Sequence, residues 1–254
     1  MEPSVCLRLT SLSRRFGGLR AVDDVSLTIP AGARHAVIGP NGAGKTTLFN
    51  LISGEIAPSS GTVVLFGEDV TTLPPHRRAG RGIARTFQVM RLFPSLTVME
   101  NALLACEALD SSKLAMLRPL SSHARLIERA RNLLTEFGLS ELGQELARNL
   151  SYGDQRKLEV ALSMAGRPRL LLLDEPMAGL SGSERNAMQD LLKKLEPTMA
   201  VLLIEHDMDV AFEFAHRITV LSQGQVLMEG TSDEVSANPS VQQIYLGSVT
   251  GSHA

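Results

Sequence analysis

One nonapeptide constrains this chain more than any other part of it. Residues 39–47 read Gly-Pro-Asn-Gly-Ala-Gly-Lys-Thr-Thr, which matches the P-loop pattern in full. An apolar run at residues 36–38 comes directly before it, and residues 48–52 follow with the composition of a helix. Because a P-loop needs a strand before it and a helix after it, the context predicts an α/β fold around a phosphate site.

Each residue type in the loop has a physical reason to be there. Glycines let the backbone approach a phosphate closely, and the N–H groups at the start of the following helix face the anion. Lys45 would reach the β- and γ-phosphates, and Thr46 can ligate magnesium. The predicted nucleotide contacts are Gly39, Pro40, Asn41, Gly42, Ala43, Gly44, Lys45, Thr46 and Thr47. A chance match would occur in about 1% of chains of this length.

A second motif supplies two carboxylates. Residues 170–176 read Leu-Leu-Leu-Leu-Asp-Glu-Pro, a buried strand that ends in adjacent acids, as in a Walker B motif. Asp174 would serve the magnesium ion, and Glu175 would polarise the attacking water as a general base. The alternative is that Asp-Glu-Pro only ends a strand and opens a turn. Beside a P-loop, the catalytic interpretation is favoured.

Composition excludes several classes of function. The 254 residues carry a net charge of -2, so no overall basic field favours a nucleic-acid partner. Cys6 and Cys106 are far apart and lack metal-ligand companions, which is typical of free thiols in a reducing compartment. The N-terminus lacks a signal-peptide pattern, and the apolar run 170–173 is far shorter than the roughly 20 residues of a membrane-spanning helix. We expect a cytosolic chain with a peripheral membrane role.

The hydrophobic pattern outlines the remaining elements. Strands are expected at 5–9, 25–29, 36–38 and 62–66, and a helix at 122–137 that Gly138 can end. Strands at 170–173 and 201–204 flank a helix whose apolar face carries Met188, Leu191, Leu192 and Leu195, which implies a parallel sheet. Residues 218–228, with Gln223 and Gly224 at the middle, read as a closing hairpin.

A hexapeptide some twenty residues before the Walker B strand points to a family. Residues 150–155 read Leu-Ser-Tyr-Gly-Asp-Gln, which resembles the signature sequence of ABC transporter cassettes. Further matches follow in family order, namely Phe16, Gln88 within Arg-Thr-Phe-Gln, Ala-Gly-Leu-Ser at 178–181 and Glu-His-Asp at 205–207. The resemblance covers nearly the whole chain. Taken alone, Ser151 could equally be an ordinary helix N-cap.

The resemblance implies a fold and a division of the chain. It implies a P-loop NTPase (RecA-like) α/β core with a parallel sheet, an N-terminal antiparallel β subdomain and an inserted helical subdomain. The whole of 1–254 would be a single cassette. Its nucleotide-binding core would span about 1–89 and 158–254, and the helical subdomain about 90–157.

The resemblance also implies roles for residues. Phe16 would stack on adenine, Gln88 would touch magnesium or water while sensing the membrane subunit, and His206 would contact the γ-phosphate. Two cassettes would close head to tail around ATP and Mg²⁺, so that Ser151 and Gly153 of one complete the site of the other. The implied catalytic residues are Glu175, His206 and Gln88, and the implied metal ligands are Thr46, Gln88 and Asp174. For His206 alone, an ordinary strand-end histidine is the alternative.

Two positions depart from the family pattern. Asp154 stands where glutamine is common in the signature, and Ser181 stands where aspartate is commoner after Walker B. Neither change removes a group assigned to the chemistry. Asp154 does add negative charge near a phosphate-binding surface.

The motifs look most like the cassettes of branched-chain amino acid importers, of the larger paired type. This implies that the chain lies at the cytoplasmic face of the membrane, with two transmembrane permease subunits and either a paralogous cassette or a second copy as partners. A periplasmic or extracellular solute-binding protein would act with it indirectly. A urea or short-amide importer and an exporter remain alternatives. A soluble ABC ATPase of translation or DNA repair and a P-loop kinase are rivals of other classes.

Overall fold

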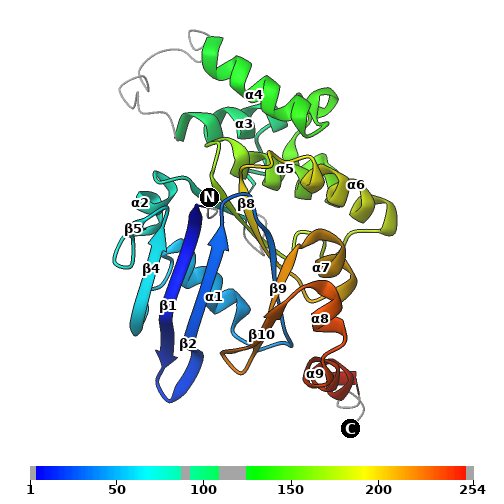
Figure 1. Ribbon diagram of the computed structural model, residues 1–254. Coiled ribbons are helices and arrows are strands. Elements are labelled where there is room, and N and C mark those ends of the chain that lie inside the picture. Colours follow the sequence, from blue (N-terminus) through cyan, green and yellow to red (C-terminus); the bar gives the residue numbers. More distant parts are fainter. Residues whose placement is uncertain (1–3, 87–91, 109–123, 250–254) are drawn as a thin grey trace. The chain divides into compact units, whose positions relative to one another are not determined.

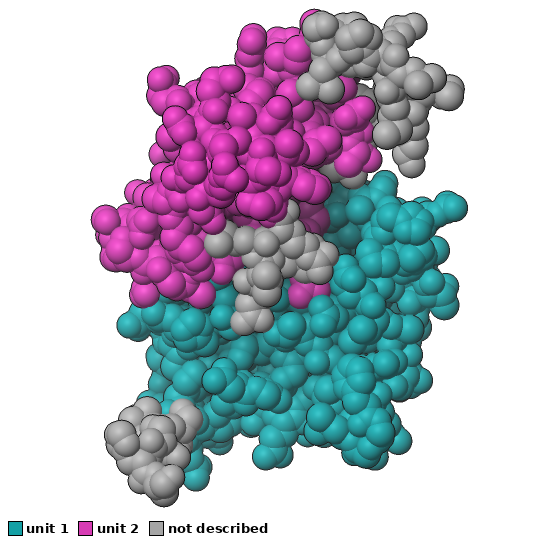
Figure 2. All heavy atoms as spheres, turned by 180° about the vertical axis from the view of Figure 1, so that it is seen from behind, with its two compact units in different colours: residues 1–83, 169–175, 195–254 teal, residues 84–168, 176–194 magenta. Residues whose placement is uncertain are grey.

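The computed structural model describes residues 4–86, 92–108 and 124–249. Two compact units divide the chain, and Figure 2 colours them teal and magenta. Unit 1 holds residues 1–83, 169–175 and 195–254, and unit 2 holds residues 84–168 and 176–194. The predicted division into core and helical subdomain stays a prediction. Gln88 lies outside the described residues.

An antiparallel sheet of four strands opens unit 1 (Figure 1). Its order is β2-β1-β4-β5, built from β1 (Val5–Phe16), β2 (Leu19–Pro30), β4 (Ser60–Leu65) and β5 (Glu68–Asp69). Leu7 and Leu9 of β1 and Leu27 and Ile29 of β2 alternate with exposed residues, which is the period of a strand with one buried face. The strands expected at 5–9 and 25–29 are confirmed and extend further, to Phe16 and back to Leu19. The strand expected at 62–66 is confirmed as β4, which begins two residues earlier and ends at Leu65.

The second sheet has the order β10-β9-β3-β8-β7-β6. Its strands are β3 (Arg34–Ile38), β6 (Ile83–Arg85), β7 (Leu170–Asp174), β8 (Ala200–Ile204), β9 (Arg217–Ser222) and β10 (Gln225–Gly230). β7, β8, β3 and β9 pair in parallel, whereas β9 and β10 form the expected antiparallel hairpin. Every residue of β3, β7 and β8 is buried, as in parallel sheets covered on both faces. Parallel strands place their carboxyl ends, and therefore a ligand site, at one edge.

Five described helices belong to unit 1. They are α1 (Lys45–Ser53), α2 (Pro75–Ala79), α7 (Met208–Phe214), α8 (Ser232–Ser236) and α9 (Pro239–Val249). α1 buries Leu48, Phe49, Leu51 and Ile52 in the same core as the leucines of β1. Apolar packing therefore fixes the helix whose first turn follows the P-loop.

Unit 2 is mainly helical in its described part. It contains α3 (Val98–Ala108), α4 (Ala124–Glu136), α5 (Tyr152–Met164), α6 (Gly182–Lys193) and 3₁₀ turns at Ser140–Leu142 and Ala147–Asn149. The helix expected at 122–137 is confirmed as α4 within the described residues, and Gly138 follows it at φ 67°. α6 ends at Lys193, so Leu195 lies beyond the helix to which its spacing had assigned it, although the side chain is buried.

The α/β fold predicted from the sequence is confirmed, with one antiparallel sheet and one mainly parallel sheet. Among the described residues, none of the helices combines the length and the apolar character needed to cross a bilayer.

Candidate active site

Two glycines of the P-loop have backbone shapes that other residues avoid. Gly39 follows β3 at φ 151°, and Gly44 precedes α1 at φ 103°. A Cβ on Gly39 would collide with the carbonyl oxygen of Leu221, and one on Gly44 with that of Ala21. The loop can therefore pass this closely between its neighbours only with glycine at both positions.

The turn of the β9–β10 hairpin supports the P-loop. The N–H of Gly224 donates to the carbonyl of Ala43 at 3.0 Å, and the carbonyl of Gly224 accepts from the N–H of Asp23 at 2.8 Å. Gln225 adds a side-chain hydrogen bond to Asp23 at 2.9 Å. The sequence predicted the hairpin but gave no signal of this contact, because the partners are about 180 to 200 residues apart along the chain.

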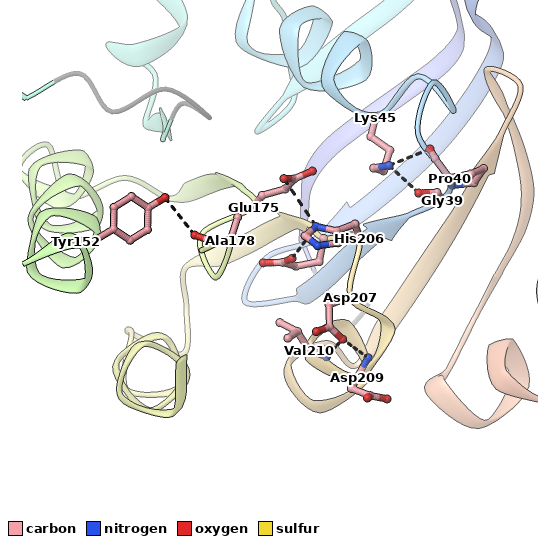
Figure 3. Close-up of polar contacts among 11 residues, drawn as sticks. Gly39, Pro40, Lys45, Tyr152, Glu175, Ala178, His206, Asp207, Asp209 and Val210 are labelled. Atoms are coloured by element: carbon pink, nitrogen blue, oxygen red, sulfur yellow. Dashed lines mark hydrogen bonds and ion pairs between the residues drawn. The ribbon is translucent and has the colours of Figure 1, made fainter. Parts of the chain in front are cut away.

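Lys45 is the first residue of α1, and its ammonium lies inside the loop. Nζ donates to the carbonyls of Gly39 at 2.6 Å and Pro40 at 3.1 Å (Figure 3). Burial lowers the pKa of Lys45, while the carboxylates of Glu175 and Asp174 act in the opposite direction. A cation is thus placed at the N-terminus of α1, where helix N–H groups also favour an anion.

Two oxygen donors suit a magnesium ion. Asp174 ends β7 with its side chain buried, and Thr46 lies exposed in the first turn of α1. Mg²⁺ is usually held by one or two carboxylates with water and substrate phosphates rather than by a cage of protein ligands. The described residues contain no cluster of three or more His, Cys, Asp or Glu side chains that could hold a metal alone. The donor set fits a metal that arrives with a nucleotide.

Glu175 occupies a strained position next to Asp174. Its φ of 49° is rare for a residue with a side chain, and its N–H donates to the carbonyl of Ile204 at 3.0 Å. Backbone strain of this kind concentrates at functional sites. The turn after β7 therefore aims Glu175 differently from the strand residues before it.

His206 approaches Glu175 from the end of the neighbouring strand. Its Nδ1 is 3.8 Å from Oε2 of Glu175 and 3.9 Å from Oε2 of Glu205, and Figure 3 shows the ring beside Glu175. The His206 side chain is 57% exposed. The parallel order of β7 and β8 brings these residues together although 31 positions separate them in the sequence.

Phe16 ends β1 with 45% of its surface exposed. The guanidinium of Arg14 lies 4.7 Å from the centre of the Phe16 ring, and Nη1 of Arg14 donates to the carbonyl of Ala57 at 2.8 Å. A cation over the ring at this distance is a cation–π contact. Sequence reasoning identified Phe16 but not Arg14.

The signature residues lie in unit 2, at the start of α5. Ser151 is the N-cap, as the simpler interpretation of the sequence predicted: its Oγ accepts from the N–H of Asp154 at 3.1 Å and donates to Asp154 Oδ2 at 2.7 Å. Gly153 is buried against Glu184, which also forms a capping box with Ser181. Tyr152 donates its hydroxyl to the carbonyl of Ala178 at 3.2 Å. The signature and the loop after Walker B are therefore joined within unit 2.

The structure thus brings Lys45, Asp174, Glu175 and His206 together in unit 1, and Thr46 follows Lys45 in the first turn of α1. Asn41 and Gly42 lie exposed in the loop, and Thr47 is half-buried. Ser151 and Gly153 are held in unit 2, and their role toward a phosphate stays a prediction.

Comparison with known proteins connects this geometry to a family. Residues 22–178 match the family described as ABC transporter. The chain is 42% identical to the high-affinity branched-chain amino acid transport ATP-binding protein BraF of Pseudomonas aeruginosa and 40% identical to LivG of Escherichia coli K12, each over 95% of this chain and 97% of the relative. It is 32% identical, with the same coverage, to the lipopolysaccharide export system ATP-binding protein LptB of Escherichia coli K12.

Solved structures agree with the sequence relatives. The ADP conformation of MJ1267, an ATP-binding cassette of an ABC transporter, matches with a TM-score of 0.86 and 29% identity over 96% of this chain and 99% of that one. The dimeric cassette MJ0796 bound to ADP and Pi matches with a TM-score of 0.75 and 28% identity over 89% and 98%. The chain therefore belongs to the ABC transporter family and is one of its ATP-hydrolysing cassettes.

Proposed function

We propose that this chain energises the import of branched-chain or other hydrophobic amino acids across the cytoplasmic membrane. The observation that carries the proposal is the convergence of Lys45, Glu175 and His206 at one edge of the unit 1 sheet. The choice of solute is supported by the names of the relatives at 40–42% identity. The cassette itself does not contact the solute, so the residues of this site support hydrolysis and not the choice of cargo.

Nucleotide binding would use groups already in place. The Lys45 ammonium would exchange the carbonyls of Gly39 and Pro40 for phosphate oxygens. The loop N–H groups and the α1 N-terminus would hold the β-phosphate, and the exposed ring of Phe16 would stack on adenine. Thr46 and Asp174 would hold Mg²⁺, which supplies charge neutralisation to the phosphates when bound. We assign the third proposed metal contact, Gln88, from the family resemblance alone.

Hydrolysis would follow from the two groups at the strand ends. Glu175 would accept a proton from the attacking water, since its side chain is 21% exposed and can meet one. His206 would contact the γ-phosphate and stabilise the charge that develops there. Ser151 and Gly153 of a facing cassette would supply further donors to the same phosphate.

The partners follow from this arrangement. We propose a head-to-tail pair of cassettes, with either a paralogous subunit or a second copy of this chain, and the dimeric relative MJ0796 supports pairing. The pair would sit on two transmembrane permease subunits at the cytoplasmic face of the membrane. A solute-binding protein outside the membrane would act indirectly, and no nucleic acid takes part.

Uptake of labelled leucine tests the proposal, with labelled urea measured in parallel. Cells whose only copy carries Glu175→Gln should lose leucine uptake and keep urea uptake. Loss of urea uptake alone would move the chain to the urea or short-amide importers. Intact uptake of both solutes would contradict an import role for either one and direct attention to export, the function named for LptB.

The same variant separates the rival classes. In a cassette, Glu175→Gln should preserve ATP binding and stop hydrolysis. A P-loop kinase would still transfer phosphate to a small acceptor. Co-sedimentation with membranes rather than ribosomes would exclude a role in translation.

A further inference from the structure

Glu205 is a buried carboxylate to which the proposed mechanism gives no role. It follows directly after β8, and its relative exposure is 0%. Its N–H donates to the carbonyl of Val37 at 3.4 Å, which continues the pairing of β8 with β3 by one residue. Asp207, two positions later, caps α7 by accepting from the N–H of Asp209 at 3.0 Å. The backbone on both sides of His206 is therefore fixed.

This carboxylate is buried beside the histidine of the site. Oε2 of Glu205 lies 3.9 Å from Nδ1 of His206, and the same nitrogen lies 3.8 Å from Oε2 of Glu175. The Glu205 side chain is 1% exposed, whereas that of Glu175 is 21% exposed. One edge of the imidazole thus faces two carboxylates, one enclosed by protein and the other open to water.

A carboxylate is an unusual side chain at the buried position that Glu205 occupies. All five residues of β8, Ala200–Ile204, are buried and apolar, so packing alone would favour another apolar side chain at the next position. Burying a carboxylate is costly unless it interacts with polar partners. A carboxylate that faces one ring nitrogen of a histidine fixes the orientation and tautomer of the ring, as in histidine ligands and catalytic triads.

We propose that Glu205 is a positioning residue that acts through His206. By facing Nδ1, it holds the ring so that Nε2, on the other edge, meets the γ-phosphate next to the water held by Glu175. The distances of 3.8 and 3.9 Å are longer than hydrogen bonds, and such contacts commonly tighten only in the complex with substrate. This inference rests on the proposed roles of Glu175 and His206 and extends them to Glu205.

Substitution of Glu205 in the assembled transporter tests the proposal. Glu205→Gln keeps the shape and removes the charge, so kcat for ATP hydrolysis should fall by about 10- to 100-fold, as for other residues that orient a functional histidine. The Kd of the purified chain for a fluorescent ATP analogue should change by less than about twofold, because the proposed role of Glu205 is to orient His206 for hydrolysis and not to hold the nucleotide. Thr219→Val, a buried polar change on β9 of the same sheet, is the control and should leave kcat unchanged.

A double-mutant cycle with His206→Ala shows whether Glu205 acts through the histidine. In the His206→Ala background, Glu205→Gln should lower kcat no further. A further loss equal to that in the wild-type background would overturn the inference, as would a wild-type kcat for Glu205→Gln. If His206→Ala alone left kcat unchanged, the proposed role of His206 itself would be wrong, and this outcome is distinct from a failure of the inference about Glu205.

A second variant tests the proposal even if Glu205→Gln does not fold. Glu205→Asp keeps the charge but withdraws it by one methylene, and it should lower kcat in the wild-type background and not in the His206→Ala background. Full activity of Glu205→Asp, or a loss that persists without His206, would count against the proposal whether or not Glu205→Gln folds.

Discussion

Arg78 offers a sharp test of how the phosphate-binding helix is held. Its guanidinium donates to the carbonyls of Leu51 and Ile52 in the last turn of α1, at 2.7 and 2.8 Å, and to those of Thr71 and Leu73, both at 2.9 Å. The residue is 1% exposed. A cation at the carboxyl end of a helix satisfies carbonyls that have no partner within the helix and complements the helix dipole.

The magnitude follows from these four hydrogen bonds. Each contributes a net of about 1 kcal/mol to the free energy of unfolding, a value that already includes the loss of water. Burial lowers the pKa of Arg78 to about 10, so the group stays protonated near neutral pH. Arg78→Met should therefore cost about 4 kcal/mol. For a chain of this size that lowers Tm by roughly 10 °C.

Thermal and urea denaturation of the purified chain measure the loss, and the neighbouring exposed Arg77 supplies the control. Arg77→Met should change the free energy of unfolding by less than about 0.5 kcal/mol. Arg78→Lys keeps the charge but has fewer, differently directed donors, so about half of the loss should remain. If Arg78→Met were no less stable than Arg77→Met, the assignment of Arg78 as the anchor of α1 would be wrong.

Three further predictions concern other parts of the chain. Burial, with Arg217 nearby, lowers the pKa of His35 to about 4. The neutral imidazole therefore contributes fully to the free energy of unfolding above the unfolded pKa of about 6.5, and this contribution is lost as the pH falls from there toward 4. The free energy of unfolding, measured with urea, should fall by about 2 kcal/mol between about pH 7.5 and pH 5. His35→Gln should show little of this fall, and an unchanged pH dependence in that variant would contradict the prediction. Arg14→Ala should weaken ATP binding by about two- to fivefold in a fluorescence titration, because the cation–π contact that orders Phe16 is lost, and the effect should vanish in a Phe16→Ala background. Asp154→Gln removes a carboxylate that accepts from Ser151 and should lower the ATP concentration that drives cassette pairing in sedimentation experiments; a higher concentration would show that Asp154 supports the contact.

The local signals predicted the parts of the site that lie within one stretch of chain. The P-loop and the hairpin carry glycine where their geometry needs a positive φ, at Gly39, Gly44 and Gly224. The strand, loop and helix around the P-loop and the closing hairpin were predicted correctly because backbone shape and residue type are linked locally, whereas the roles of Asp174 and Glu175 stay predictions. The α/β fold followed from the same strand and helix periods.

Contacts between distant segments were not predicted. Nothing in the neighbourhood of Arg78 indicates that its guanidinium would cap α1, some 26 residues away, and α2 itself was too short to show a helical period. The support of Ala43 by Gly224, and the meeting of His206 with Glu175, depend on which strands are neighbours in the sheet. Strand order is a tertiary property that a single sequence specifies only indirectly.

ATP binding and ATP turnover by the purified Glu175→Gln variant show whether ATP is hydrolysed at the site of Lys45 and Glu175. We expect an unchanged Kd for ATP and a fall in the hydrolysis rate of at least about 100-fold, because the phosphate contacts remain and the general base is removed. A hydrolysis rate equal to that of the wild type would contradict this expectation.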